Sequence, residues 1–317
     1  MITSAIFKAK ARAVLSKHWQ TALLIALIVN LPSLLIQGIG TVTNTDPLTR
    51  VQLLMIEASS STAAMNALPD ALLKLLSETG VLVMLGLGIL VWVVTPALSL
   101  GMTHWTLDRI RGMEEPVSTV FSRLRIVLKG IGLRLWITLQ VLLWMLPGIA
   151  ATVLSLIPLY RANAADTASV YSAMRTSSML IWFGMMLMIV LGAIGYLRYA
   201  MADFILADEP EEQVLACARR SKEMMNGRRG ALAGLLLSFL VWYLLIILLT
   251  GFLASVFGDV VALVMQMLGS LFLSVYALTA QGVFYEALRL AALRPVQVSA
   301  ESPDDSGDEP PEDLPEG

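Results

Sequence analysis

The sequence predicts an all-α membrane protein whose chain crosses the bilayer six times. Of its 317 residues, 57% are apolar and only 15% are charged, whereas an ordinary soluble domain carries about 25% charged residues. The apolar residues are gathered in long runs instead of alternating with polar ones. Because about 20 apolar residues are enough to cross a hydrocarbon core of roughly 30 Å, runs of this length indicate membrane-spanning helices.

Six such runs form one membrane domain over residues 1–294. The predicted spans cover approximately residues 20–39, 80–107, 133–160, 178–206, 231–257 and 260–290. Pro147-Gly148 is expected to interrupt the third span, and a short amphipathic helix is expected to open at Leu68-Pro69-Asp70, in the long connection before the second span. Residues 295–317 are acidic and contain several prolines and serines, a composition that predicts a disordered tail.

The basic residues predict the orientation of the chain. Of the 22 lysines and arginines, 18 lie in the segments that share a side with the N-terminus. Since lysine and arginine are enriched on the cytoplasmic side of a membrane, we expect both termini to be cytoplasmic. The first apolar run follows a long basic segment and has no A-x-A exit, so we interpret it as a retained span and not as a cleavable signal peptide.

Short amphipathic helices with basic residues precede the outward spans. We expect them to lie along the cytoplasmic face and to contact anionic lipid headgroups, each charge contributing about 1 kcal/mol near the surface. The residues assigned to this contact are Lys8, Lys10, Arg12, Lys17, Arg219, Arg220, Lys222, Arg228 and Arg229. Each basic helix is followed by an outward and a returning span, which predicts a parallel threefold pseudo-repeat of helix pairs. Any six-span protein with short inner helices would show the same pattern, and that alternative stays open.

Four stretches of the chain carry a family resemblance. They are residues 10–19 (KARAVLSKHW), 199–210 (YAMADFILADEP), 218–227 (ARRSKEMMNG) and 284–289 (FYEALR), of which the second is the most specific. Together they resemble the bacterial integral membrane proteins grouped as domain of unknown function 975, over most of the chain up to about Leu290. The resemblance implies a multi-pass protein of the bacterial cytoplasmic membrane, and it brings no established activity or catalytic residues.

Few charged residues fall within the predicted spans. His104 and Asp108 lie four residues apart near the inner end of the second span, hence on one helical face. They are either a proton-relay or ion-binding pair or an interfacial histidine beside a helix-end charge. In the fourth span, Asp203 is expected to pair with Arg109 or Arg198, and a substrate or proton site is the alternative.

Glu286 occupies a comparable inner position on the sixth span. Together with Asp108 and Asp203, it gives three acidic residues near three inner span ends. Two interpretations follow from this placement. The three carboxylates either line one cytoplasmic vestibule or are unrelated helix-end charges.

The sequence contains no motif of enzyme chemistry: no Walker A loop, no H-E-x-x-H and no nucleophile elbow. With one cysteine and two histidines, no metal site or cofactor is expected, and the net charge of −2 suggests no nucleic-acid partner. We therefore expect a non-enzymatic scaffold, assembly or accessory component that binds lipids, other membrane proteins or a second copy of itself. The alternative is a transporter or exporter of a small or lipid-like solute, with a proline-broken third span and acidic inner ends.

Overall fold

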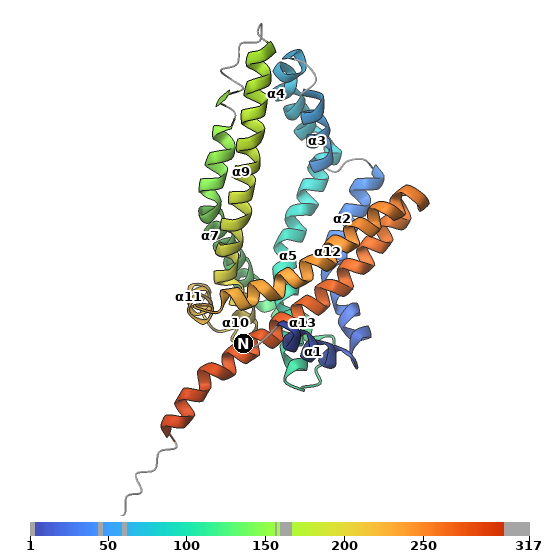
Figure 1. Ribbon diagram of the computed structural model, residues 1–317. Helices are drawn as coiled ribbons and strands as arrows, with labels where there is room; N and C mark the ends of the chain where they lie inside the picture. The colour runs from blue at the N-terminus through green and yellow to red at the C-terminus, as the bar shows by residue number, and fades with distance from the viewer. Residues whose placement is uncertain (1–3, 44–46, 59–61, 156, 159–166, 301–317) are drawn as a thin grey trace, which may run out of the picture.

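The computed structural model describes residues 4–43, 47–58, 62–155, 157–158 and 167–300, and every secondary-structure element over these ranges is helical (Figure 1). The elements are α1 (Ser4–Leu15), α2 (Trp19–Thr43), α3 (Pro47–Ala58), α4 (Thr62–Ser77), α5 (Thr79–Ile110), α6 (Thr119–Ser122), the 3₁₀ turn η1 (Arg123–Ile126), α7 (Val127–Leu154), α9 (Thr167–Tyr199), α10 (Ala202–Asp208), α11 (Val214–Met224), α12 (Arg229–Phe257) and α13 (Asp259–Ala300).

Six of the described helical segments are long and apolar enough to cross a membrane: α2, α5, α7, α9 with α10, α12, and α13. The predicted all-α class with six spans is therefore confirmed. Some bounds differ from those predicted. The third span begins at Val127 instead of residue 133, and its predicted end at residue 160 lies outside the described residues. Helix α13 includes residues 295–300 of the predicted acidic tail, and residues 301–317 lie outside the described residues.

Two prolines lie in the interior of helices. The sequence predicted that one of these helices is interrupted at its proline and that the other begins near its proline. Helix α7 runs without a break through Pro147, so the predicted interruption of the third span is wrong. Helix α4 begins at Thr62 and contains Pro69 in its interior, so it does not open at Leu68. A proline removes one backbone donor from a helix, and within a membrane neighbouring helices and local adjustments compensate for that loss.

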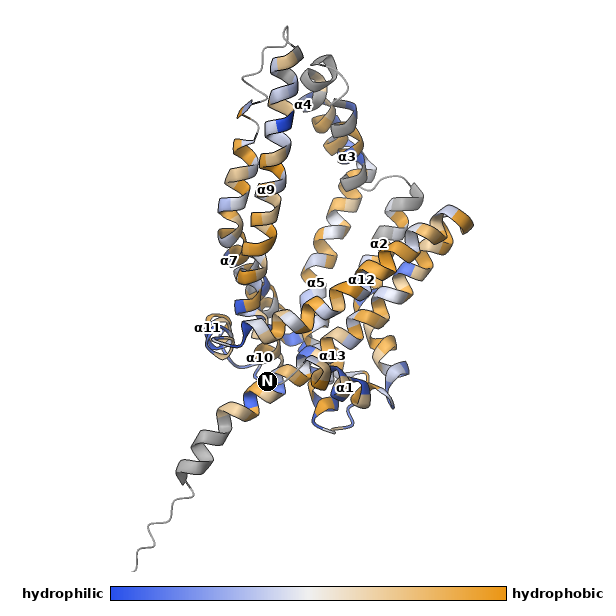
Figure 2. Ribbon diagram, in the orientation of Figure 1, coloured by the Kyte–Doolittle hydropathy of each residue, from blue (hydrophilic) through white to orange (hydrophobic). Residues whose placement is uncertain are grey.

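The long helices converge at one end of the molecule and diverge toward the other (Figure 1). We call the convergent end the hub; it consists of α1, α10, α11, residues 100–111 at the end of α5, and residues 277–289 of α13. Buried apolar side chains from these elements form one cluster, including Phe7, Leu107, Ile205, Cys217 and Phe284. Figure 2 shows hydrophilic residues gathered around the hub and mainly hydrophobic residues along α7, α9, α12 and α13.

The spans follow one another as three pairs: α2 contacts α5, α7 contacts α9, and α12 contacts α13. The α7–α9 and α12–α13 pairs stay side by side away from the hub, whereas α2 contacts α5 near the hub and lies beside α12 and α13 beyond it (Figure 1). In each pair one helix leads away from the hub and the other returns to it (Figure 1). This arrangement agrees with the predicted order of outward and returning spans. Whether the three pairs are true repeats stays a prediction.

The fourth span consists of two helices, because α9 ends at Tyr199 and α10 begins at Ala202. Ser221 of α11 inserts its hydroxyl at this break. The Ser221 hydroxyl accepts a hydrogen bond from the Met201 N–H (3.2 Å) and donates one to the Arg198 carbonyl (3.2 Å). The buried backbone groups at the break are thereby satisfied, and α11 is fixed against the end of the span.

Helices α7 and α9 approach each other closely at two glycines. A Cβ placed on Gly148 would lie 2.6 Å from the backbone N of Met188 and 2.9 Å from the carbonyl oxygen of Gly184. Small residues at such a crossing let two membrane helices bring their backbones into contact. Helices α7 and α9 can therefore pack this closely only with glycine at position 148.

Replacing Gly148 by alanine is expected to destabilise the protein by about 1–3 kcal/mol, because the added methyl group overpacks a backbone contact. Gly251 in α12 is the matched control, since a Cβ there has nothing within 4 Å, and alanine at that position should be neutral or stabilising by about 0.5–1 kcal/mol. Thermal unfolding of both variants in detergent measures the difference. Equal shifts for the two variants would contradict the close α7–α9 crossing.

Candidate functional site

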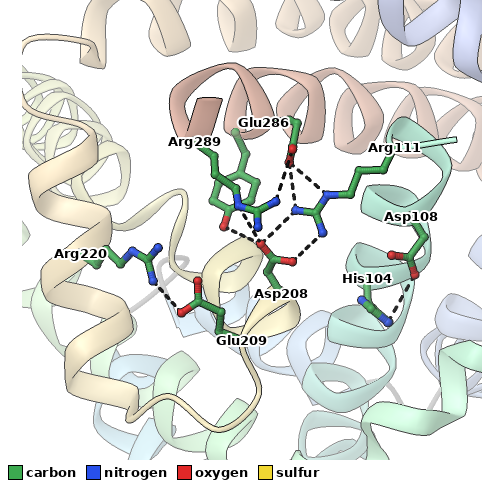
Figure 3. Close-up of polar contacts among 9 residues, drawn as sticks. His104, Asp108, Arg111, Asp208, Glu209, Arg220, Glu286 and Arg289 are labelled. Carbon is green, nitrogen blue, oxygen red and sulfur yellow. Dashed lines mark hydrogen bonds and ion pairs between the residues drawn. The ribbon is translucent and has the colours of Figure 1, made fainter. Parts of the chain in front are cut away.

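The hub contains a cluster of four charged side chains from three helices that return to it (Figure 3). Arg111, directly after α5, forms two hydrogen bonds with Asp208 at the end of α10, of 2.7 and 3.0 Å. The Arg111 Nη2 also lies 3.0 Å from Glu286 Oε2 on α13. Arg289, one turn further along α13, lies 3.6 Å from Asp208 and 3.4 Å from Glu286. The cluster therefore ties α5, α10 and α13 together.

A glycine turn fixes the position of Arg111. Gly112 has a φ of 81°, the left-handed conformation that favours glycine. Its N–H donates to the Arg109 carbonyl, and the Met113 N–H donates to the Asp108 carbonyl, which is the Schellman arrangement at a helix C-terminus. The turn ends α5 and leaves Arg111 as its cap residue, facing the other two helices.

The cluster is largely shielded from solvent and carries no net charge. The side chains of Arg111 and Asp208 are 19% and 9% exposed, and Tyr285 donates its hydroxyl hydrogen to Asp208 (3.2 Å). Tyr285 in turn stacks on Phe204 of α10. Contact with Asp208 raises the pKa of Arg111 above its usual value, so this guanidinium stays charged. The guanidinium groups of Arg111 and Arg289 thus neutralise the carboxylates of Asp208 and Glu286 in an environment from which most water is excluded.

His104 and Asp108 form a separate pair on α5, with 3.3 Å between His104 Nε2 and Asp108 Oδ2 (Figure 3). The sequence spacing predicted that they share a helical face, and this contact agrees with that expectation. The Asp108 side chain is 4% exposed. Arg123 of η1 lies close enough for its charge to interact with Asp108 and Asp208, and burial lowers the pKa of Arg123.

The pairing predicted for Asp203 is wrong. Its carboxylate lies 3.8 Å from Arg134 of α7, and not against Arg109 or Arg198. Arg198 instead lies over the ring of Trp144, 4.5 Å from its centroid, because α9 ends before Asp203 and α10 continues with a new helical register. Arg109 lies over Trp105 and donates to the Glu115 carbonyl (2.9 Å).

The three acidic residues predicted to lie near the inner span ends occupy three different environments. Asp108 contacts His104, Asp203 contacts Arg134, and Glu286 contacts Arg111 and Arg289. Each of these three carboxylates therefore has its own basic or histidine neighbour within 4 Å. No shared polar space between the three follows from these contacts.

A family model described as "Protein of unknown function (DUF975)" matches residues 1–292. The chain belongs to this family. No curated protein and no solved structure matched the chain in the corresponding searches. Membership of DUF975 thus confirms the resemblance of the four stretches.

In this DUF975 chain, most of the residues predicted to contact lipid headgroups have exposed side chains. Exceptions are Lys8, Arg220 and Arg229, which are half-buried. Lys8 lies over the ring of Phe239, 5.1 Å from its centroid, and Arg220 forms a 2.7 Å ion pair with Glu209. The exposed members are Lys10, Arg12, Lys17, Arg219, Lys222 and Arg228. Among the described residues no group of three histidine, cysteine or acidic side chains is placed to hold a metal ion.

Sequence reasoning missed Arg111, Asp208 and Arg289, which carry most of the cluster. The sequence contains a signal for Asp208. The inner ends of the three returning spans can be aligned as WTLD (105–108), ILAD (205–208) and VFYE (283–286). In each, an acidic residue follows three uncharged residues. The same is true of Asp203, so this pattern points to Asp208 without separating the two aspartates.

Replacing Arg111 by alanine is expected to destabilise the DUF975 chain by about 3–5 kcal/mol, because two buried carboxylates lose their principal partner. Arg220→Ala is the matched control: its ion pair with Glu209 has the same 2.7 Å distance, but the two side chains are 43% and 39% exposed, so its loss should cost about 0–1 kcal/mol. Thermal unfolding in detergent compares the two. Equal destabilisation would show that the cluster does not hold the hub.

Proposed function

We propose that the protein is a non-enzymatic scaffold or accessory component of the bacterial cytoplasmic membrane that binds membrane proteins and lipids. One observation carries this proposal. The hub fastens three helix pairs at one end through a charge-neutral cluster of Arg111, Asp208, Glu286 and Arg289, while the pairs diverge away from it (Figure 1). In this arrangement the hub holds the three helix pairs in fixed positions relative to one another, and the outer surfaces of the pairs face the membrane.

The surfaces of the diverging pairs support a binding role. Trp182 and Ile189 on α9 are 71% and 66% exposed, and Leu248 on α12 is 71% exposed. Side chains of this kind, facing the bilayer, contact lipid tails or the helices of another membrane protein. Since association between membrane helices depends on packing, broad surfaces with large aromatic and aliphatic side chains suit a protein that gathers partners.

The observations give less support to the transporter alternative. That reading relied on a broken third span and on acidic residues around a vestibule. Helix α7 is continuous through Pro147, and Asp108, Asp203 and Glu286 each lie beside a different basic or histidine partner. Because the three carboxylates have different partners, they do not form the shared acidic vestibule on which the transporter alternative relied.

We further propose that the hub lies on the cytoplasmic side, with both termini there. The exposed basic residues of α1 and α11 lie at the hub, whereas α3 and α4 lie toward the opposite end (Figure 1). Anionic lipids of the cytoplasmic leaflet attract exposed lysines and arginines. The positive-inside rule gives the same orientation from the sequence.

The orientation is tested by labelling single cysteines in intact cells with a membrane-impermeant maleimide. Asp70→Cys on α4 should be labelled from outside, and Glu223→Cys on α11 only after the cells are opened; both positions are exposed. The native Cys217 supplies a silent background, because it is fully buried and burial raises its thiol pKa to about 11. Labelling of Glu223→Cys but not Asp70→Cys in intact cells would reverse the orientation.

The scaffold role predicts a stoichiometric partner. A photo-crosslinking amino acid at Trp182 should give a defined protein adduct in living cells, because this side chain faces outward. The matched control is the same amino acid at Phe284, which is 2% exposed inside the hub and should give no intermolecular adduct. Purification in a gentle detergent with mass spectrometry then identifies the partner, a second copy of the chain included. Repeated isolation of the lone chain without adducts would refute the scaffold role.

A further inference from the structure

A groove of about 410 Å³ lies on α5, between α2 and α7. Its lining includes Ser33 of α2, Trp92 and Thr95 of α5, and Arg134 of α7. Most of this lining is apolar or weakly polar, and Arg134 is its one charged side chain. The groove is thus apolar along most of its length and basic at one place.

Arg134 lies on the part of α7 that enters the membrane from the hub. It is seven residues after Val127, which corresponds to about 10 Å along the helix axis. One and a half turns earlier, Lys129 donates to the carbonyls of Pro210 and Glu211 (2.8 and 3.1 Å) at the hub. Arg134 is therefore within about two turns of the polar hub, and its long side chain can reach the headgroup level from there.

The guanidinium of Arg134 has unused hydrogen-bonding capacity. Its side chain is 43% exposed, and its nearest acidic neighbour, Asp203, lies at 3.8 Å, beyond hydrogen-bond distance. Among the hydrogen bonds of the described residues none involves Arg134, although a guanidinium has five N–H donors. Arg111 in the hub, by contrast, donates to two carboxylates. Asp203 is thus an ion-pair neighbour of Arg134 that leaves the N–H donors of the guanidinium free for an additional anionic ligand.

The apolar part of the groove has room for the part of an acyl chain nearest the headgroup. It extends along α5 from Pro96 to Gly88, eight residues or about 12 Å. A Cβ added at Gly88 would meet nothing within 4 Å, so the groove is open at this glycine. Trp92, which is 47% exposed, lies between these two positions and offers an apolar wall.

We propose that this groove binds one glycerophospholipid of the hub-side leaflet, with the phosphate on Arg134 and an acyl chain along α5 between Pro96 and Gly88. A guanidinium matches a phosphate geometrically and binds it through two N–H donors. Arg134 is the charged group of the lining, so the phosphate is recognised and the alcohol of the headgroup is not. This inference rests on the lipid-binding part of the proposed function and gives it a specific site.

The test counts phospholipids retained by the purified full-length protein in native mass spectrometry. The wild type should retain one phospholipid, and Arg134→Gln should lower its occupancy by about tenfold or more, because charge-assisted hydrogen bonds are lost. Arg125→Gln removes the same charge from an exposed arginine of η1 outside the groove and should leave the occupancy unchanged. Asp203→Asn should also retain the lipid, which separates loss of the phosphate site from loss of the Arg134–Asp203 pair.

A second pair of variants tests the acyl-chain part independently of the charge. Gly88→Leu should fill the groove and displace the lipid, whereas Gly86→Leu, which also has open space around its Cβ but lies outside the lining, should not. Added phosphatidylglycerol and phosphatidylethanolamine should both restore occupancy to delipidated wild type, and diacylglycerol, which lacks the phosphate, should not.

Equal occupancy in Arg134→Gln and Arg125→Gln, or restoration by diacylglycerol, would overturn the lipid site. The scaffold role is judged separately by the adduct at Trp182. A missing lipid with an intact adduct would therefore refute the groove inference alone, and a retained lipid without an adduct would refute the protein-binding role alone.

Discussion

The balance of charge inside the hub is the constraint on which the arrangement of the spans depends. Arg111, Asp208, Glu286 and Arg289 come from α5, α10 and α13, the three helices that return from the membrane. A buried charge without a partner is costly. Any other packing of these three ends would separate at least one charge from its partner, so the cluster selects one relative placement of the three helix pairs.

Fastening at one end has consequences for the rest of each span. Beyond the hub, the α7–α9 pair is held together chiefly by its own contacts, such as the close approach at Gly148 and Gly184. The outer faces are left to the bilayer, which accepts apolar side chains at no cost. This division explains how large side chains such as Trp182 are exposed in a stable protein, and it leaves room for a lipid-sized groove between neighbouring pairs.

The sequence was sufficient for the helical class and the number of spans, because apolar run length follows directly from bilayer thickness. It was insufficient where residues distant in the sequence determine the course of a helix or the partner of a side chain. Pro147 was expected to break a helix that continues through it. Asp203 was assigned a partner on its own or an adjacent span, but the break between α9 and α10, satisfied by Ser221, turns it toward Arg134. No local pattern around residue 203 encodes a hydroxyl contributed by α11.

Arg111 and Arg134 show why residue type and depth alone do not identify a site. Both are arginines near the level where the hub meets the spans, and both have an aspartate of α10 as a neighbour. Arg111 is enclosed and its donors are occupied by Asp208 and Glu286, so it can only support the fold. Arg134 is half exposed at the edge of an apolar groove, and its donors are not used by the described residues. Arg134, whose N–H donors are free, is therefore the group that can bind a ligand, although the pKa of Arg111 is the one raised by its neighbours.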